Sequence, residues 1–214
     1  MADLAQIADN VIRGQAPKVE ELVKNALAEG TSVQDILNDG LIKGMSVVGE
    51  KFKANEFYVP EVLIAARAMK TGLDLIRPGL ADSGVEPVGK VAVGTVKGDL
   101  HDIGKNLVAM MLEGAGFEVI DLGIDVEPAR FIDAIQTQGA QIIGMSALLT
   151  TTMPLMKETI DAIREAGLRD NVKILIGGAP ITQAYADQIG ADGYARDAAS
   201  GADLAKELVE SSAA

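Results

Sequence analysis

Apolar residues recur at helical spacing in four stretches of the N-terminal part of the chain. The stretches run from Leu4 to Ile12, from Val19 to Leu27, from about Thr31 to Phe52 and from Pro60 to Ile76. Within each of them the apolar side chains fall three or four positions apart, which places them on one face of a helix. Four helices with brief connections are typical of a small antiparallel bundle. We therefore predict an N-terminal four-helix bundle.

The helical pattern stops at a segment rich in residues that break secondary structure. The segment from Arg77 to Gly89, RPGLADSGVEPVG, contains two prolines and three glycines. Such residues mark turns and connections between elements. We therefore predict a linker here and place the domain boundary inside it, with a helical domain over residues 1–86 and a second domain over residues 87–214.

After the linker, short apolar runs alternate with amphipathic segments. Strands separated by helices pair in parallel, and helices then cover both faces of the sheet. We predict an α/β domain with a doubly wound five-stranded parallel sheet of the Rossmann or flavodoxin-like kind. The strands are expected at residues 90–96, 118–122, 141–146, 172–176 and 192–195, and the helices at residues 104–114, 128–138, 154–165, 182–188 and 201–210.

Charge and composition exclude several classes of function. The net charge of −12 disfavours nucleic acids, which bind through lysine and arginine, and it disfavours anionic membranes. There is no signal pattern and no run of about 18 apolar residues, so we expect a cytoplasmic protein. The absence of cysteine excludes disulfides, thiolate nucleophiles and zinc–sulfur sites. Any imidazole chemistry has to use His101, the only histidine.

Three segments with glycines and polar side chains directly follow predicted strands. They are residues 98–104 (GDLHDIG), residues 146–150 (SALLT) and Gly177-Gly178. In a doubly wound sheet, ligands bind beyond the carboxyl ends of the strands, so these segments are expected to meet at one crevice. The strand end at Gly123-Ile124-Asp125 carries no comparable group.

Each of these features also has an ordinary structural explanation. A lone histidine in a loop is usually a surface or packing residue, and the glycines suit turns or helix starts. The first strand is followed by neither G-x-G-x-x-G nor G-x-x-x-x-G-K-[ST], so the usual phosphate-binding loops are absent. Asp99 or Asp125 at a strand end is an alternative candidate for a phosphate acceptor, as in receiver domains. Location alone favours a shared site and leaves its ligand open.

The order and spacing of the three segments resemble the complete motif of the base-off, His-on cobalamin-binding proteins. The stretch TVKGDLHDIGKNLV resembles the cobalamin region of cobalamin-dependent methionine synthase, and residues 39–70 resemble the helical cap that precedes that region. With this length, the chain is similar to the separate corrinoid proteins of methyltransferase systems. The parts of the motif, with 41 and then 28 residues between them, are Asp99-x-His101-x-x-Gly104, Ser146-x-Leu148 and Gly177-Gly178.

The resemblance implies a cobalamin whose own base has left the cobalt. His101 would then supply the lower axial nitrogen and would be the metal ligand, while Asp99 would accept the other ring N–H. Thr152 corresponds to a serine that extends this series of hydrogen bonds in methionine synthase, and the threonine hydroxyl can extend it as well. The β-branch of threonine is a departure from that pattern.

The resemblance also assigns contacts to the rest of the cofactor. Glycine would let the cofactor tail pass close to the backbone, and the hydroxyl groups would lie near the lower face or the tail. For Thr150 and Ala198, ordinary packing is an equal alternative. The expected cofactor-binding residues of this domain are Gly98, Asp99, Leu100, His101, Asp102, Ile103, Gly104, Ser146, Leu148, Thr150, Thr152, Gly177, Gly178 and Ala198.

Three residues of the helical domain match the family's cap. Phe52 and Val59 correspond to apolar cap residues that shield the upper face of the cofactor, although Val59 replaces a leucine. Without the resemblance, both would be taken for helix-core residues. Asp39 matches an acidic position near the cap, for which a solvated surface role is an equal alternative.

By resemblance, the chain is a methyl carrier. It would accept a methyl group on cobalt from a substrate-specific methyltransferase and deliver it to a second methyltransferase with a folate or thiol acceptor. It would have no independent enzymatic activity, and a reductive activase is a further expected partner. Two other functions stay open: a cobalamin-binding sensor or regulator, and the cobalamin subunit of a radical isomerase. The methyl donor is a property of the partner.

Overall fold

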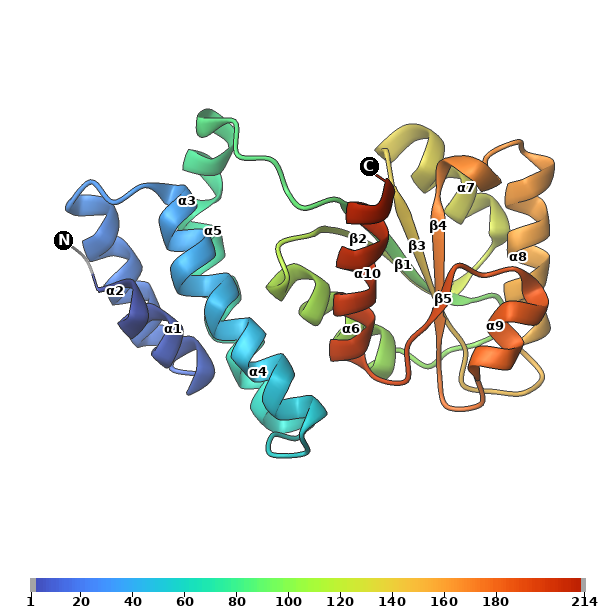
Figure 1. The fold of residues 1–214 in the computed structure, drawn as a ribbon, viewed down its shortest axis with the longest axis horizontal. Helices are drawn as coiled ribbons and strands as arrows, with labels where there is room; N and C mark the ends of the chain where they lie inside the picture. Colours follow the sequence, from blue (N-terminus) through green and yellow to red (C-terminus); the bar gives the residue numbers. More distant parts are fainter. Residues whose placement is uncertain (1–2, 213–214) are drawn as a thin grey trace. The chain divides into compact units, whose positions relative to one another are not determined.

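The structure, a computed structural model, describes residues 3–212, and it divides into two compact units (Figure 1). One unit contains the residues up to Glu86 together with Gly114–Gly116. The other contains Pro87–Glu113 and the residues from Phe117 onward. The first unit is entirely helical and the second contains a sheet, as the change of hydrophobic pattern predicts.

The first unit consists of four helical segments, one of which is composite. Its buried side chains come from every segment and include Val11, Val23, Leu41 and Ile76. Helix α1 begins after Asp3, whose carboxylate accepts the N–H of Gln6. In the composite segment, a π-helical stretch separates two α-helical parts. The elements are α1 (Leu4–Ile12), α2 (Ala16–Ala28), the composite α3 (Val33–Asp35), η1 (Ile36–Ile42) and α4 (Lys43–Lys53), and α5 (Val59–Ser83).

The last helix of this unit continues into the segment that was predicted to be a linker. Helix α5 does not end before Arg77 but runs to Ser83, with Pro78 inside it, and ends at Gly84 in the left-handed conformation with φ 68°. A Cβ at Gly79 would lie 2.8 Å from Cγ1 of Val33, so α5 packs closely on the start of the composite helix here. Tertiary packing overrides the local tendency of proline to end a helix. The prediction of a linker starting at Arg77 is therefore wrong.

The second unit contains the predicted sheet of five parallel strands. Their order is β2-β1-β3-β4-β5, so the chain leaves β1 toward one edge and later returns to add strands on its other side. The point where the order reverses lies between β1 and β3. The strands are β1 (Lys90–Val96), β2 (Glu118–Val126), β3 (Ile142–Ser146), β4 (Lys173–Gly177) and β5 (Gly193–Tyr194).

Helices cover both faces of this sheet, as the doubly wound prediction requires (Figure 1). On one face, α7, α8 and α9 bury apolar side chains such as Ile160 and Ile189 against Ile143 and Ile174 of the strands. Helices α6 and α10 lie on the other face. The helices are α6 (Ile103–Gly114), α7 (Pro128–Gln138), α8 (Pro154–Glu165), α9 (Gln183–Ile189) and α10 (Ala198–Ser212), with a short 3₁₀ turn η2 (Arg169–Asn171) before β4.

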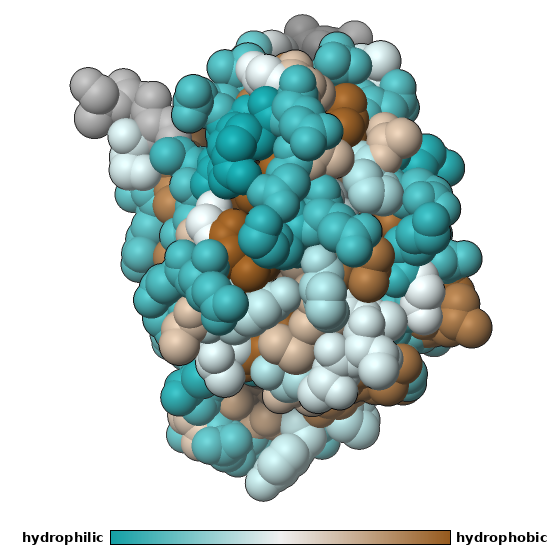
Figure 2. Space-filling model, turned by 90° about the vertical axis from the view of Figure 1, so that its right-hand side faces the viewer, coloured by the Kyte–Doolittle hydropathy of each residue, from teal (hydrophilic) through white to brown (hydrophobic). Residues whose placement is uncertain are grey.

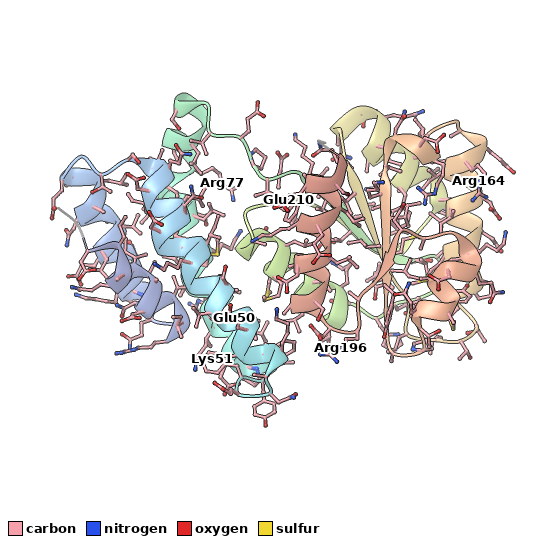
Figure 3. All side chains as sticks on the ribbon, in the orientation of Figure 1. Glu50, Lys51, Arg77, Arg164, Arg196 and Glu210 are labelled. Atoms are coloured by element: carbon pink, nitrogen blue, oxygen red, sulfur yellow. The ribbon has the colours of Figure 1, made fainter. Side chains whose placement is uncertain are left out.

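The outer side of α8 is polar. Figure 2 faces this side of the second unit and shows mostly hydrophilic side chains, with apolar ones scattered among them. Arg164, labelled in Figure 3, pairs there with Asp161 at 2.6 Å, and both side chains are exposed to solvent. Among the helices of residues 3–212, none is both long and apolar enough to cross a membrane.

The packing of Phe131 on β1 gives a test of the sheet's core. Phe131 is fully buried, and a Cβ at Gly94 would lie 2.9 Å from its ring, so the ring rests directly on the strand backbone. We expect Phe131→Ala to lower the free energy of unfolding by about 3–5 kcal/mol, because it removes this contact and leaves a cavity. Arg130→Ala, at the exposed neighbouring position, is expected to change it by less than about 0.5 kcal/mol. Urea unfolding followed by circular dichroism measures both, and equal losses would contradict this view of the core.

Candidate functional site

The candidate site lies at the carboxyl ends of β1 and β3, on either side of the point where the strand order reverses. The loop after β1 carries residues 97–102, and the segment after β3 carries residues 147–153. Because β1 and β3 are neighbouring parallel strands, both segments leave the sheet at the same edge. Two of the three segments chosen from the sequence therefore meet as predicted.

The central group of this site is the carboxylate of Asp99, which is fully buried. Its Oδ2 accepts the hydroxyl of Thr152 at 2.7 Å and the backbone N–H of Leu148 at 2.8 Å. Its Oδ1 accepts the backbone N–H of His101 at 3.1 Å. One carboxylate thus ties the loop after β1 to the segment after β3.

The same carboxylate orients the imidazole of His101. Nδ1 of the ring lies 2.9 Å from Oδ1 of Asp99, and about half of the histidine side chain (52%) is exposed. Because a carboxylate accepts this hydrogen bond, the ring proton belongs on Nδ1, and Nε2 then keeps its lone pair. The sequence-based pairing of Asp99 with His101 is present in the geometry.

Burial and hydrogen bonding act on the carboxyl of Asp99 in opposite directions. Burial alone would raise its pKa, because it disfavours the charged form. The hydrogen bonds from Leu148, Thr152 and His101 outweigh this effect and hold the pKa of Asp99 well below its usual range. Asp99 is therefore a permanent anion at neutral pH, which is the form that can hold the Nδ1 proton of His101.

A buried hydroxyl fixes the loop at the histidine itself. Thr95, the penultimate residue of β1, is fully buried, and its Oγ1 donates to the backbone carbonyl of His101 at 2.7 Å. The sequence analysis did not select Thr95, although a threonine inside an otherwise apolar strand was a signal that could have drawn attention to it. The histidine is thus held through its ring by Asp99 and through its carbonyl by Thr95.

Apolar side chains in the loop of His101 and in the segment after β3 are exposed to solvent. The exposed fractions of Leu100, Ile103 and Leu148 are 69%, 75% and 40%. Gly104 opens α6 next to them, and a Cβ there would meet no atom within 4 Å. Exposed apolar side chains that gather in one place mark a surface that binds another molecule. Asp102, in the same loop, is exposed and accepts the side-chain N–H of Asn106 at 3.2 Å.

The third predicted segment adjoins the second through the sheet. Ser146 pairs with Gly177 across β3 and β4, and the N–H of Ala147 donates to the carbonyl of Gly177 at 3.2 Å. Gly178 has φ 133°, and a Cβ there would overlap the carbonyl oxygen of Ala147 at 1.8 Å. Only glycine fits this position, as the close approach of two backbones requires.

Two of the remaining predicted residues belong to the second unit and three to the first. Thr150 is exposed, in the segment after β3, and Ala198 is buried at the start of α10. Phe52, Val59 and Asp39 belong to the first unit, in α4, α5 and η1 respectively. Phe52 and Val59 are partly buried and Asp39 is exposed. The assignment of these five residues to a cofactor stays a prediction.

The end of β2 contributes more to the site than the sequence suggested. Gly123-Ile124-Asp125 was expected to carry no group comparable to those of the other strand ends. However, the carboxylate of Asp125 accepts the N–H of Gly98 at 2.7 Å. Asp125 is separated from Gly98 by 27 positions in the sequence, and no local pattern signals that contact.

The donor set fits a metal that brings most of its own ligands. Among the described residues, no three or more histidine, aspartate or glutamate side chains are placed to hold a metal ion together. His101 offers one imidazole nitrogen, backed by a carboxylate and rimmed by exposed apolar side chains. One axial nitrogen on an apolar surface suits a large, flat metal macrocycle such as a corrin. The fold and the site therefore define a corrinoid-binding protein.

The chain belongs to the family of proteins with B12 binding domains. A family model described as a B12 binding domain matches residues 89–203, and a second model with the same description matches residues 3–77. The chain is 43% identical over 212 residues to a corrinoid protein of Desulfitobacterium hafniense, and the match covers 98% of each chain. It is 44% identical over 206 residues to dimethylamine corrinoid protein 3 of Methanosarcina acetivorans, with 96% of each chain covered.

A solved structure resembles both units together in sequence and fold. It is the methanol:cobalamin methyltransferase complex of Methanosarcina barkeri. The TM-score is 0.84 at 30% sequence identity, and the match covers 95% of this chain and 78% of that one. These comparisons confirm the predicted family, fold class and cofactor class.

Replacing the buried carboxylate tests its structural part in the site. Asp99→Asn puts an amide NH₂ where donors from two loops converge, so we expect it to lower the free energy of unfolding of the cofactor-free protein by about 1–3 kcal/mol. Asp102→Asn, in the same loop but exposed, is the matched control and is expected to cost less than about 0.5 kcal/mol. Urea unfolding at neutral pH measures both. A similar, small change in the two variants would contradict the central position given to Asp99.

Proposed function

We propose that this chain is the corrinoid carrier subunit of a methyltransferase system. The observation that carries the proposal is the pair Asp99–His101, with a buried anionic carboxylate on Nδ1 and a half-exposed ring. The similarity to a dimethylamine corrinoid protein and to a methanol:cobalamin methyltransferase complex supports methyl transfer over the sensor and isomerase alternatives. We expect no catalytic activity of the chain alone, and a cytoplasmic location stays a prediction.

In this proposal His101 would hold the cobalt of the cofactor through Nε2. Cobalamin, when bound, supplies a cobalt that takes up and gives up a methyl group. Asp99 keeps the proton on Nδ1 and makes the imidazole a better donor. The hydroxyl of Thr152 donates a hydrogen bond to the second oxygen of Asp99. A series of hydrogen bonds thus connects His101, through Asp99, to the segment after β3. The threonine at this position does what the serine of the related motif would do.

The other predicted residues are proposed to hold the rest of the cofactor. Leu100, Ile103 and Leu148 would cover its apolar surface, since they are the exposed apolar side chains next to the histidine. The backbone at Gly178, where a side chain would overlap Ala147, would border the cofactor tail. The remaining proposed contacts are those of Gly98, Asp102, Gly104, Ser146, Thr150, Gly177 and Ala198.

The first unit is proposed to act as a cap, with residues 1–86 as the cap domain and residues 87–214 as the cobalamin-binding domain. Phe52 and Val59 would contribute apolar cover for the cofactor, and Asp39 a polar contact. The proposed partners are a substrate-specific methyltransferase, an acceptor methyltransferase and a reductive activase. Because the chain contributes one ligand and an apolar surface, the choice of methyl donor belongs to the first partner.

The axial role is tested by the absorption spectrum of the protein loaded with hydroxocobalamin. The wild-type protein is expected to show a histidine-ligated spectrum. His101→Ala is expected to abolish it, because no other imidazole exists in the chain. Added imidazole should restore ligation in this variant and have little effect on the wild-type protein. An unchanged spectrum in His101→Ala would contradict the axial role.

The carrier role is tested by methyl transfer to the reduced, cobalamin-loaded protein. We expect methylation from methanol or a methylamine only when a cognate methyltransferase is present, because the activated substrate is held by that partner. Absorption spectroscopy follows the reaction, and each donor is tried with and without candidate partners. Rapid methylation with no partner would contradict the carrier role. Dissociation or a change of oligomeric state on illumination, in place of methyl transfer, would favour the sensor.

A further inference from the structure

Asp125 has a backbone conformation that is unusual for a residue with a side chain. Its φ is 53°, in the left-handed region, and it shares this property with Asn55 among the described non-glycine residues. It lies next to the last residue of β2, where the pairing of β1 with β2 shifts register twice. Aspartate and asparagine tolerate this region better than other side chains. Such outliers persist where the surroundings fix them, and they are frequent at functional sites.

The contacts of Asp125 converge on two residues of the loop after β1, residues 97–102, which we call the histidine loop. Its carboxylate accepts the N–H of Gly98 at 2.7 Å, and its own N–H donates to the carbonyl of Asp99 at 3.1 Å. Gly98 has φ 76°, so the chain makes a left-handed turn here that the hydrogen bond from its N–H stabilises. Asp125 therefore clamps both ends of the Gly98–Asp99 unit, two residues before His101.

The end of β2 is itself anchored from the far side of the loop. Lys105, in the first turn of α6, is almost fully buried, and its ammonium contacts both oxygens of Asp121 at 2.6 and 2.7 Å. Asp121 also accepts the N–H of Gly123 at 2.9 Å. The strand end that carries Asp125 is thus tied to the helix that follows the histidine loop, which makes it a fixed support.

The histidine loop is consequently held on two sides. The segment after β3 holds the side chain of Asp99 through Leu148 and Thr152. The end of β2 holds the backbone of Gly98 and Asp99 through Asp125. Removing the contacts of Asp125 leaves the hydrogen bonds of the Asp99 carboxylate in place. It frees the backbone of Gly98 and Asp99, however, and this backbone sets the direction of that carboxylate. A small rotation there changes where Nε2 of His101 points.

We propose that Asp125 is a positioning residue for His101, which presets the direction of the axial nitrogen by clamping the backbone of Gly98 and Asp99. The proposal rests on the axial role given to His101 under the proposed function. Asp125 touches neither the cobalt nor the histidine ring. It acts through the loop, so its removal weakens ligation by His101 and leaves intact the contacts that the segments after β3 and β4 would make with the cofactor.

Two variants separate the carboxylate from the backbone of Asp125, and a third serves as the control. Asp125→Gly keeps the left-handed conformation and the N–H to Asp99 but loses the acceptor for Gly98. Asp125→Asn keeps a neutral acceptor. Glu127→Gln is the matched control, because Glu127 is an acidic residue close by that pairs with Lys97 at 2.9 Å on the exposed surface. Affinity for hydroxocobalamin is measured by absorption titration. The nitrogen-ligated fraction is measured from the splitting that the bound nitrogen causes in the electron paramagnetic resonance signal of the cobalt(II) form.

The expected losses follow the strength of the acceptor. Asp125→Gly is expected to bind hydroxocobalamin about tenfold more weakly and to show a smaller nitrogen-ligated fraction, as loss of one hydrogen bond to a charged acceptor predicts. Asp125→Asn is expected to bind hydroxocobalamin about threefold more weakly, because a neutral acceptor forms a weaker hydrogen bond than a charged one. Glu127→Gln is expected to stay within about twofold of the wild-type protein. Wild-type affinity and ligation in Asp125→Gly would overturn the proposal.

A double-mutant cycle with His101→Ala distinguishes positioning from a general structural role. If Asp125 acts through the ligand, Asp125→Gly causes no further loss of affinity once His101 is absent. A tenfold loss that persists in the His101→Ala background would overturn the proposal. Should Asp125→Gly fail to fold, as judged by thermal unfolding of the cofactor-free protein, the same cycle is read with Asp125→Asn. An unchanged spectrum in His101→Ala itself would contradict the proposed axial role, which is a separate outcome.

Discussion

The buried carboxylate of Asp99 is the interaction on which the site depends. An ionised group without solvent is unstable unless hydrogen bonds replace its hydration. Asp99 obtains them from the loop after β1 and from the segment after β3, including the hydroxyl of Thr152. The requirement to satisfy one anion therefore fixes the loop after β1 relative to the segment after β3. It also sets the tautomer of His101, because a permanently charged acceptor keeps the proton on Nδ1.

The architecture around this anion could be predicted from the sequence because it depends on local patterns. Apolar runs separated by amphipathic segments define β1, β3 and the helices between them within one or two residues. The predicted ends of elements are wrong where contacts between residues far apart in the sequence determine them. Helix α5 passes Pro78 because Gly79 packs on Val33, 46 positions earlier in the chain. Strand β2 continues to Val126 because β1 pairs with it past two register shifts.

The same difference between local patterns and distant contacts applies to the site. The pairing of Asp99 with His101 could be predicted because the two residues lie in one loop and form part of a motif that resembles a known family. Thr95 gave only the signal of a hydroxyl inside an apolar strand, and Asp125 gave none, because it contacts the loop from another strand 27 positions away. A sequence motif identifies the residues that touch a ligand. It does not identify those that hold the motif in place, since these are selected by the geometry of a particular sheet.

The arrangement also separates a buried part of the site from an exposed part. The part around Asp99 is buried and is hydrogen-bonded to the segment after β3 and to the end of β2. The exposed part consists of a half-exposed imidazole and the side chains of Leu100 and Ile103. These groups can hold a macrocycle, but they offer no polar pattern that would select a small methyl donor. Under the proposed function, selectivity among donors would come from the surface of the methyltransferase that approaches this side.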